Sequence, residues 1–132
     1  MTSTSLNNVS VLCVDNYIDS LELLKVSLEL CGARVCGAVS LDDAVRAFHV
    51  HHPNVLISDL ALPEGNGISV LQAIRGHDPS ISAIALTGIS DPKVRQQALD
   101  AGFNRYFIKP VDYQALIQAV YALAFKGKKL SA

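Results

Sequence analysis

The sequence predicts an α/β domain in which helices cover both faces of a doubly wound, five-stranded parallel sheet. Short apolar runs alternate five times with segments whose apolar residues recur at helical spacing. The runs are nearly continuous in apolar residues, which is typical of strands buried on both faces. Parallel strands joined by helices need right-handed crossovers, and such crossovers build a sheet of this kind. A length of 132 residues fits one domain.

The predicted strands each end at a turn residue or a helix start. In chain order they span residues 9–14, 33–37, 54–58, 81–86 and 105–108. Pro53 precedes the third strand and Asp78-Pro79 precedes the fourth, and both are signals that end a helix. The third helix is expected to begin near Gly67.

The predicted helices start and stop at residues that favour those positions. Ser40, Asp91 and Asp112 stand at N-termini, where their side-chain oxygens can accept hydrogen bonds from backbone N–H groups. Gly32 and Gly102 follow C-termini. Residues at helical spacing form the inner faces, in chain order: Leu21, Leu24, Leu28 and Cys31; Ala44, Ala47 and Phe48; Val70, Leu71 and Ile74; Val94, Ala98 and Ala101; Tyr113, Leu116, Val120 and Leu123.

Composition limits the classes of function. Half of the residues are apolar, 17% are charged and the net charge is −1, which indicates a compact globule without a nucleic-acid or membrane surface. No apolar stretch could span a bilayer, and the N-terminus lacks a secretory signal. We expect a flexible N-terminus over 1–8, one domain over 9–125 and a short basic tail over 126–132.

Histidine and cysteine give no sign of a metal site. Cys13, Cys31 and Cys36 lack C-x-x-C spacing, and we interpret them as small buried residues in a reducing cytoplasm. His49, His51 and His52 lie near a predicted helix end, and their spacing does not place three imidazoles on one helical face. We therefore interpret these histidines as solvated, and His77 as a lone turn residue.

Four apolar runs end on a polar residue: Asp15, Asp59, Thr87 and Lys109. The carboxyl ends of parallel strands meet at one edge of a sheet, so these side chains are expected to converge. Asp59 is the candidate nucleophile, and Mg²⁺ would relieve its repulsion with Asp15. The hydroxyl of Thr87 and the ammonium of Lys109 can bind phosphoryl oxygens. The set therefore predicts a phosphoryl-transfer site.

The motifs around these residues resemble a known family. Val11–Asn16, Asp59–Pro63 with Gly67, Thr87-Gly88 and Tyr106–Pro110 occur in this order. Together they resemble a response-regulator receiver domain of two-component signalling, and the resemblance covers about Val9 to Phe125. It implies a flavodoxin-like (βα)5 fold with strand order 2-1-3-4-5, and a cis-proline at Pro110.

The resemblance implies a role for each site residue. Asp59 would accept a phosphoryl group from a phosphohistidine on a sensor histidine kinase or a histidine phosphotransfer protein. Mg²⁺ would be held by Asp15, Asp59 and the main-chain carbonyl of Ala61, and Thr87 and Lys109 would contact the phosphoryl oxygens. The family's signalling domains are not classical enzymes, although they assist their own phosphorylation and dephosphorylation.

The switch and the partners also follow from the resemblance. Thr87 would move toward the phosphoryl group, the aromatic Tyr106 would turn inward, and the surface of the fourth helix, fifth strand and fifth helix would change. A downstream protein target would bind that surface. A homodimer is also compatible with the resemblance, whereas direct binding to nucleic acid or a membrane is not expected.

One position departs from the family. The family usually has two adjacent acidic residues after the first strand, and here the second is Asn16. Its amide oxygen can still ligate Mg²⁺ but contributes no formal charge, so weaker metal binding is expected.

Two alternatives remain open. A pseudo-receiver would bind proteins without being phosphorylated, and Asn16 is its only support. A flavodoxin-like cofactor binder would need a Ser/Thr/Gly-rich phosphate loop after the first strand, where this chain has the acidic segment Asp15–Asp19.

Overall fold

The structure is a computed structural model that describes residues 4–62 and 65–126. Its main sheet is parallel and has the order β2-β1-β3-β6-β7. The strands are β1 (Ser10–Val14), β2 (Arg34–Ala38), β3 (Val55–Ser58), β6 (Ser82–Thr87) and β7 (Arg105–Ile108). When only these five strands are counted in chain order, their arrangement across the sheet is 2-1-3-4-5. The predicted fold class and topology are therefore confirmed.

Two further short strands form a separate antiparallel pair. They are β4 (Ala61–Leu62) and β5 (Gly65–Asn66), which follow directly on the strand that carries Asp59. Strands of two residues are too short to show an alternating pattern, so the sequence did not predict them. Pro63, part of the motif around Asp59, lies outside the described residues.

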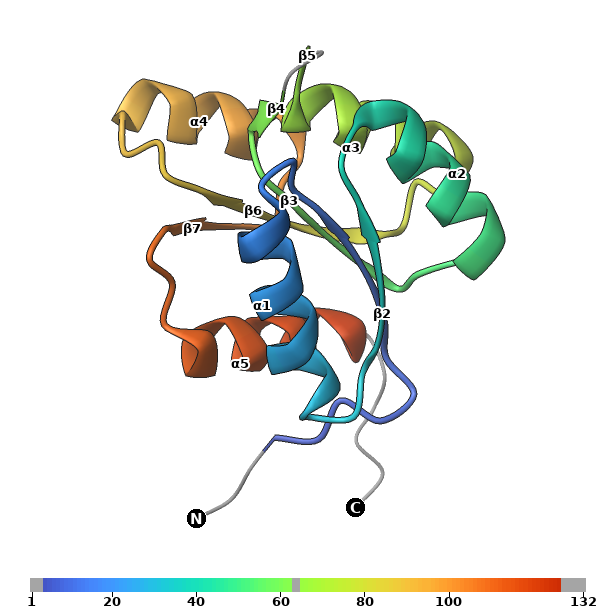
Figure 1. The fold of residues 1–132 in the computed structure, drawn as a ribbon. Helices are drawn as coiled ribbons and strands as arrows, with labels where there is room; N and C mark the ends of the chain where they lie inside the picture. Colours follow the sequence, from blue (N-terminus) through green and yellow to red (C-terminus); the bar gives the residue numbers. More distant parts are fainter. Residues whose placement is uncertain (1–3, 63–64, 127–132) are drawn as a thin grey trace.

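Helices cover both faces of the sheet (Figure 1). The helices α1 (Ile18–Glu29) and α5 (Tyr113–Ala124) lie on one face. The other face carries α2 (Leu41–His51), α3 (Gly67–His77) and α4 (Pro92–Ala101). In the described part of the chain, no helix has the length and hydropathy of a bilayer span.

The sheet separates two apolar cores, which explains why its strands are apolar at consecutive positions. Val11 and Cys13 belong to the core beneath α1 and α5. Leu12 and Val14 belong to the core beneath α2, α3 and α4. Because alternate residues of a strand point to opposite faces, both sets must be apolar.

The helix starts confirm the predicted caps. Ser40, Asp91 and Asp112 each accept a hydrogen bond from a backbone N–H group in the first turn of the following helix. Asn66 caps α3 in the same way, accepting from two N–H groups. An asparagine directly before the expected start at Gly67 was a usable signal for this cap.

The polar N-terminal segment contributes one residue, Leu6, to the apolar core. Residues 1–8 were expected to be flexible, yet Leu6 is fully buried in the core beneath α1 and α5. Its N–H group donates to the carbonyl of Cys31 at 2.7 Å. Leu6 is thus part of this core although the residues around it in the sequence are polar. Of the predicted tail, residues 127–132 lie outside the described residues.

Two predictions about burial are only partly right. Cys13 is buried, but Cys31 and Cys36 are half-buried. On α4 only Ala98 is fully buried, whereas Val94 and Ala101 are half-buried. The inner stripe of α4 is therefore even thinner than its spacing indicated, and α1 has three buried leucines by comparison.

Arg75 joins three segments on the α3 side of the sheet. Its guanidinium donates to the carbonyl of Ile81 at 2.9 and 3.2 Å and to the carbonyl of Gly102 at 2.6 Å. It also donates to Oδ1 of Asn104 at 3.1 Å. A Cβ atom at Gly102 would meet this guanidinium, and Gly102 has φ of +119°, so glycine is required there for two reasons.

Candidate functional site

Asp15, Asp59 and Lys109 directly follow β1, β3 and β7, and their side chains meet at the carboxyl edge of the sheet. The Nζ atom of Lys109 donates to Oδ2 of Asp15 at 2.7 Å and to Oδ2 of Asp59 at 2.9 Å. Val14 pairs with Ser58 in the sheet, so the residues that follow them lie side by side. The predicted convergence is therefore present, and one ammonium group bridges two carboxylates.

Each carboxylate is also fixed by a backbone donor. Asp15 and Asp59 are only 4% and 8% exposed. Their Oδ1 atoms accept from the N–H groups of Tyr17 at 2.9 Å and Ala61 at 3.0 Å. Two buried carboxylates thus have ordered partners for both oxygens, and the edge of the sheet carries concentrated negative charge.

The local environment favours the charged form of Lys109. Burial acts to lower the pKa of its ammonium group, but the hydrogen bonds and charges of Asp15 and Asp59 act in the opposite direction. The net result is a pKa raised above the ordinary lysine value. Lys109 therefore keeps its positive charge beside the two carboxylates.

Thr87 lies next to this group and is almost fully buried, with 1% exposure. Its main-chain carbonyl accepts from the N–H group of Lys109 at 2.8 Å. Its hydroxyl accepts from the N–H group of Ile89 at 3.4 Å. The hydroxyl is thus held by the loop between β6 and α4.

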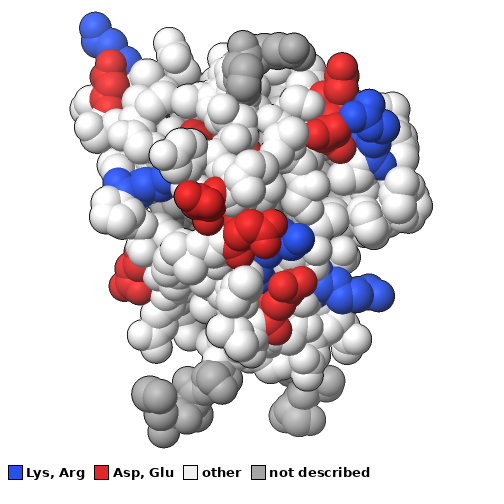
Figure 2. Space-filling view, in the orientation of Figure 1, with Lys and Arg blue, Asp and Glu red and all other residues white. Residues whose placement is uncertain are grey.

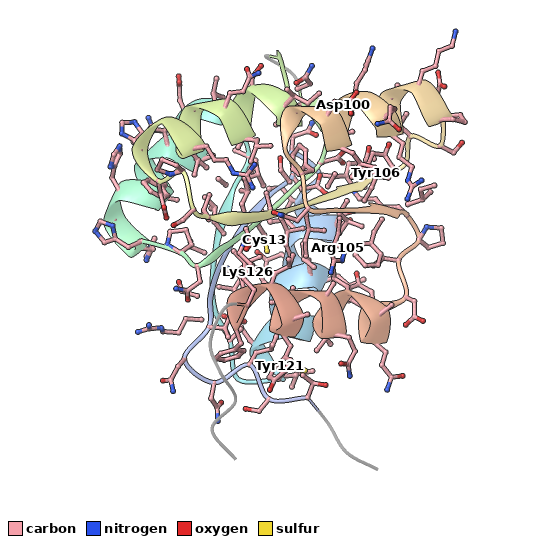
Figure 3. All side chains as sticks on the ribbon, turned by 180° about the vertical axis from the view of Figure 1, so that it is seen from behind. Cys13, Asp100, Arg105, Tyr106, Tyr121 and Lys126 are labelled. Atoms are coloured by element: carbon pink, nitrogen blue, oxygen red, sulfur yellow. The ribbon has the colours of Figure 1, made fainter. Side chains whose placement is uncertain are left out.

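Tyr106 is half-buried and packs against the core on the α4 side of the sheet, whereas Tyr121 lies on α5 on the opposite side (Figure 3). The hydroxyl of Tyr106 donates to the main-chain carbonyl of Ile89 at 2.7 Å. Burial raises the pKa of this phenol. The charge of Arg95 acts against this rise, and the charges of Asp59 and Asp91 add to it.

Gly67 permits the close packing of the chain beside Asp59. A Cβ atom at this position would meet the main-chain carbonyl of Asp59. The N–H group of Gly67 donates to the carbonyl of Leu60 at 3.1 Å. The start of α3 thus lies against the backbone of the candidate nucleophile, and a side chain there would displace one of them.

The oxygen atoms at the site suit a hard cation. Carboxylates, an amide and a carbonyl are the ligands that Mg²⁺ prefers, and Asp15, Asp59, Asn16 and Ala61 supply them. Asn16 and Ala61 are exposed at the same edge. Within residues 4–62 and 65–126, no three histidine, cysteine, aspartate or glutamate side chains form a group that could hold a metal. The acidic site thus offers the carboxylates of Asp15 and Asp59 and, at position 16, a neutral amide.

An apolar groove opens beside the acidic residues. It has a volume of about 410 Å³ and lies between α1 and the connection from β7 to α5, with Asp15, Leu23, Lys109 and Pro110 in its wall. Leu23 in this wall is 55% exposed, and Leu30, which caps the C-terminus of α1, is 83% exposed. Figure 2 shows this face of the molecule, where charged side chains are separated by stretches of uncharged surface.

The structure brings together three of the predicted residues directly and places the others around them. Asp15, Asp59 and Lys109 form the centre, and Thr87 and Tyr106 are linked through the main chain of Ile89. The sequence did not indicate Ile89, because it takes part through its backbone and its side chain carries no signal. The peptide bond between Lys109 and Pro110 is cis, as the resemblance implied.

Comparisons with known proteins agree with this geometry. The family model described as the response regulator receiver domain matches residues 11–121. An uncharacterised 14.6 kDa protein of Leptolyngbya boryana is 38% identical over 125 residues, which cover 92% of this chain and 95% of that protein. The transcriptional regulatory protein PrrA of Mycobacterium bovis is 32% identical, over 91% of this chain and 52% of its own length. The chain thus spans about half of that regulator.

Solved structures show the same fold. A response regulator receiver domain protein of Clostridium thermocellum superposes with a TM-score of 0.82 at 29% identity, covering 88% of this chain and 94% of the other. A two-component response regulator of Clostridium difficile has a TM-score of 0.85 at 23% identity, covering 90% and 98%.

Proposed function

The chain belongs to the response-regulator receiver domain family, and from this premise we propose that Asp59 accepts a phosphoryl group from a phosphohistidine. The observation that carries the proposal is the bridge from Lys109 to both Asp15 and Asp59. A carboxylate beside a cation at a strand end supports the proposal, because phosphoryl transfer needs a positioned nucleophile and neutralisation of charge.

The transfer proceeds by attack of a carboxylate oxygen of Asp59 on phosphorus. The new O–P bond forms as the P–N bond to the imidazole of the donor breaks, and the bonding electron pair returns to that nitrogen. The ammonium of Lys109 would move from the carboxylate of Asp59 to a phosphoryl oxygen, with its charge retained because its pKa is raised by Asp15 and Asp59 against the effect of burial.

Mg²⁺ fits the oxygen atoms present at this site. Asp15, Asp59, the carbonyl of Ala61 and the amide oxygen of Asn16 would hold it, and the bound ion would neutralise charge between the carboxylates and the phosphoryl group. The side chains of Asp15 and Asp59 are kept in place by the N–H groups of Tyr17 and Ala61.

The phosphorylated domain would signal through Thr87 and Tyr106. A phosphoryl oxygen at Asp59 offers the hydroxyl of Thr87 a stronger acceptor than its present long contact at 3.4 Å with Ile89. Movement of Thr87 would release the N–H group of Ile89, whose carbonyl is bound by Tyr106. The loop and Tyr106 would then rearrange together.

The surface of α4, β7 and α5 would carry this change to a downstream protein. The strand β7 is an edge of the sheet, and its Ile108 is 45% exposed. The helix α4 buries only one residue completely, which suits an element that shifts. The output would therefore be binding of a target protein rather than a chemical reaction.

The free thiols of Cys13, Cys31 and Cys36 support a cytoplasmic location.

The donor would be a sensor histidine kinase or a histidine phosphotransfer protein that docks over α1. The apolar groove ends at Asp15 and Lys109, so a protein seated there can direct an imidazole at Asp59. With a phosphorylated sensor-kinase domain as donor, Leu23→Ser in the wall of the groove should slow transfer, whereas Val50→Ser on α2, 71% exposed, should not. Equal rates for the two variants would reject this docking site.

The primary test is phosphorylation by a small-molecule phosphodonor with Mg²⁺, measured on a phosphate-affinity gel. Wild type should shift and Asp59→Ala should not. The control Asp42→Ala removes an exposed acidic residue of α2 and should shift like wild type. If no protein shifts, the pseudo-receiver interpretation takes the place of this proposal.

A further inference from the structure

The strongest unassigned feature is a group of histidines at the ends of α2 and α3. A pocket of about 420 Å³ is lined by Phe48, His49, His52, Pro53, His77 and Asp78. The ring centroids of His49 and His77 are 4.6 Å apart. In the sequence, β3, the short strands β4 and β5 and most of α3 lie between these two residues, so their proximity could not be seen in it.

We propose that His49 and His77 form a two-imidazole binding site for a borderline divalent transition metal, such as Zn²⁺ or Cu²⁺. With metal–nitrogen distances of about 2.0–2.1 Å, two imidazoles on one tetrahedral ion have ring centroids roughly 5 Å apart. The observed separation of 4.6 Å is close to this value. Small side-chain rotations would bring one nitrogen of each ring to the ion.

The surroundings of the pair favour a cation. His49 and His77 lie in the last turns of α2 and α3, where unpaired carbonyls and the helix dipole present negative charge. Asp78 adds a carboxylate to the pocket wall. Both imidazoles are exposed, so an ion can reach them from solvent.

The rings have a rigid support. His77 stacks on Phe48 with centroids 6.2 Å apart, and His49 meets the edge of Phe48 at 5.4 Å. Phe48 is only 6% exposed and belongs to the core beneath α2, α3 and α4. Since the described residues contain no ready three-ligand group, water would fill the remaining coordination positions. Nitrogen ligands also separate this site from the oxygen-lined acidic site, which suits Mg²⁺.

The test is calorimetric titration of the untagged full chain with ZnCl₂ at neutral pH in excess Mg²⁺. Wild type should bind one ion, and His49→Asn and His77→Asn should each weaken binding roughly tenfold or more. The control His51→Asn removes an imidazole from the same helix that lines a different pocket, and it should bind like wild type. Asp59→Ala should also bind like wild type.

Two results would overturn the proposal. One is equal weakening by His49→Asn and His51→Asn, which would indicate unspecific binding to surface histidines. The other is loss of binding in Asp59→Ala with retention in both pocket variants, which would place the ion in the acidic site. A thermal unfolding scan without metal checks that each variant folds. With Zn²⁺, the melting temperature should rise in wild type, His51→Asn and Asp59→Ala, and it should rise much less in His49→Asn and His77→Asn.

Discussion

The hydroxyl of Tyr106 donates a hydrogen bond of 2.7 Å to the main-chain carbonyl of Ile89. The N–H group of Ile89 donates to the hydroxyl of Thr87 at 3.4 Å. One backbone position thus connects the two residues that the family resemblance assigns to the switch. Movement of either side chain therefore alters a hydrogen bond to the loop between β6 and α4.

Tyr106→Phe should loosen this loop without preventing phosphorylation. The substitution removes one donor and keeps the half-buried ring, so a loss of about 0.5–1.5 kcal/mol in the free energy of unfolding is expected. Amide hydrogen exchange over residues 88–91 should become faster. Tyr121→Phe on α5 is the control, and equal exchange in the two variants would contradict the role of the bond to Ile89.

Lys109 should make stability depend on alkaline pH. Its folded-state pKa is raised by Asp15 and Asp59 in spite of burial, so its contribution is complete below the unfolded value of about 10.4. That contribution is lost as the pH rises through the folded pKa. Urea unfolding at a series of pH values above about 9 should show a steeper loss for wild type than for Lys109→Met. Lys93→Met, at an exposed position, should keep the wild-type slope.

Gly67→Ala and Gly76→Ala offer a matched pair on one helix. A Cβ atom at Gly67 would meet the carbonyl of Asp59, so this change should destabilise the fold by about 1–3 kcal/mol and reduce phosphorylation. A Cβ atom at Gly76 has nothing within 4 Å, so alanine there should stabilise α3 by about 0.5–1 kcal/mol. Chemical unfolding of both variants measures the difference. Stabilisation by both would show that α3 can retreat from Asp59 at little cost.

Asn16→Asp should lower the Mg²⁺ concentration needed for phosphorylation. The substitution adds a formal charge at the exposed position after Asp15 and so strengthens a hard-cation site. The measurement is the yield of phosphorylated protein against Mg²⁺ concentration, with a small-molecule donor. A curve that coincides with wild type would show that Asn16 does not limit metal binding.

The sequence predicted the sheet well because its strands carry two independent signals. Consecutive apolar residues such as Val11 and Leu12 belong to opposite cores. Thr87 is the last residue of its strand, and Asp15, Asp59 and Lys109 each directly follow one. The centre of the site followed from these strand ends, since parallel strands must gather them at one edge.

Contacts that depend on the main chain or on distant segments could not be predicted. Ile89 acts through its peptide groups, and the pair β4 and β5 is too short to leave a pattern. His49 and His77 come together only because α2 and α3 pack side by side. Leu6 stands alone in a polar segment, so its burial follows from tertiary packing and not from local pattern.

The hydrogen bonds of Arg75 hold the C-terminal end of α4 in place. They attach Gly102, at the carboxyl end of α4, to Ile81 and Asn104 in the neighbourhood of the sheet. The opposite end of the helix continues from the loop that holds Ile89. Rearrangement of that loop would therefore rotate α4 about its C-terminal end, with a large displacement at Pro92 and a small one at Gly102. A downstream protein would detect the switch as a change in helix angle, felt most at the end nearest the phosphoryl group.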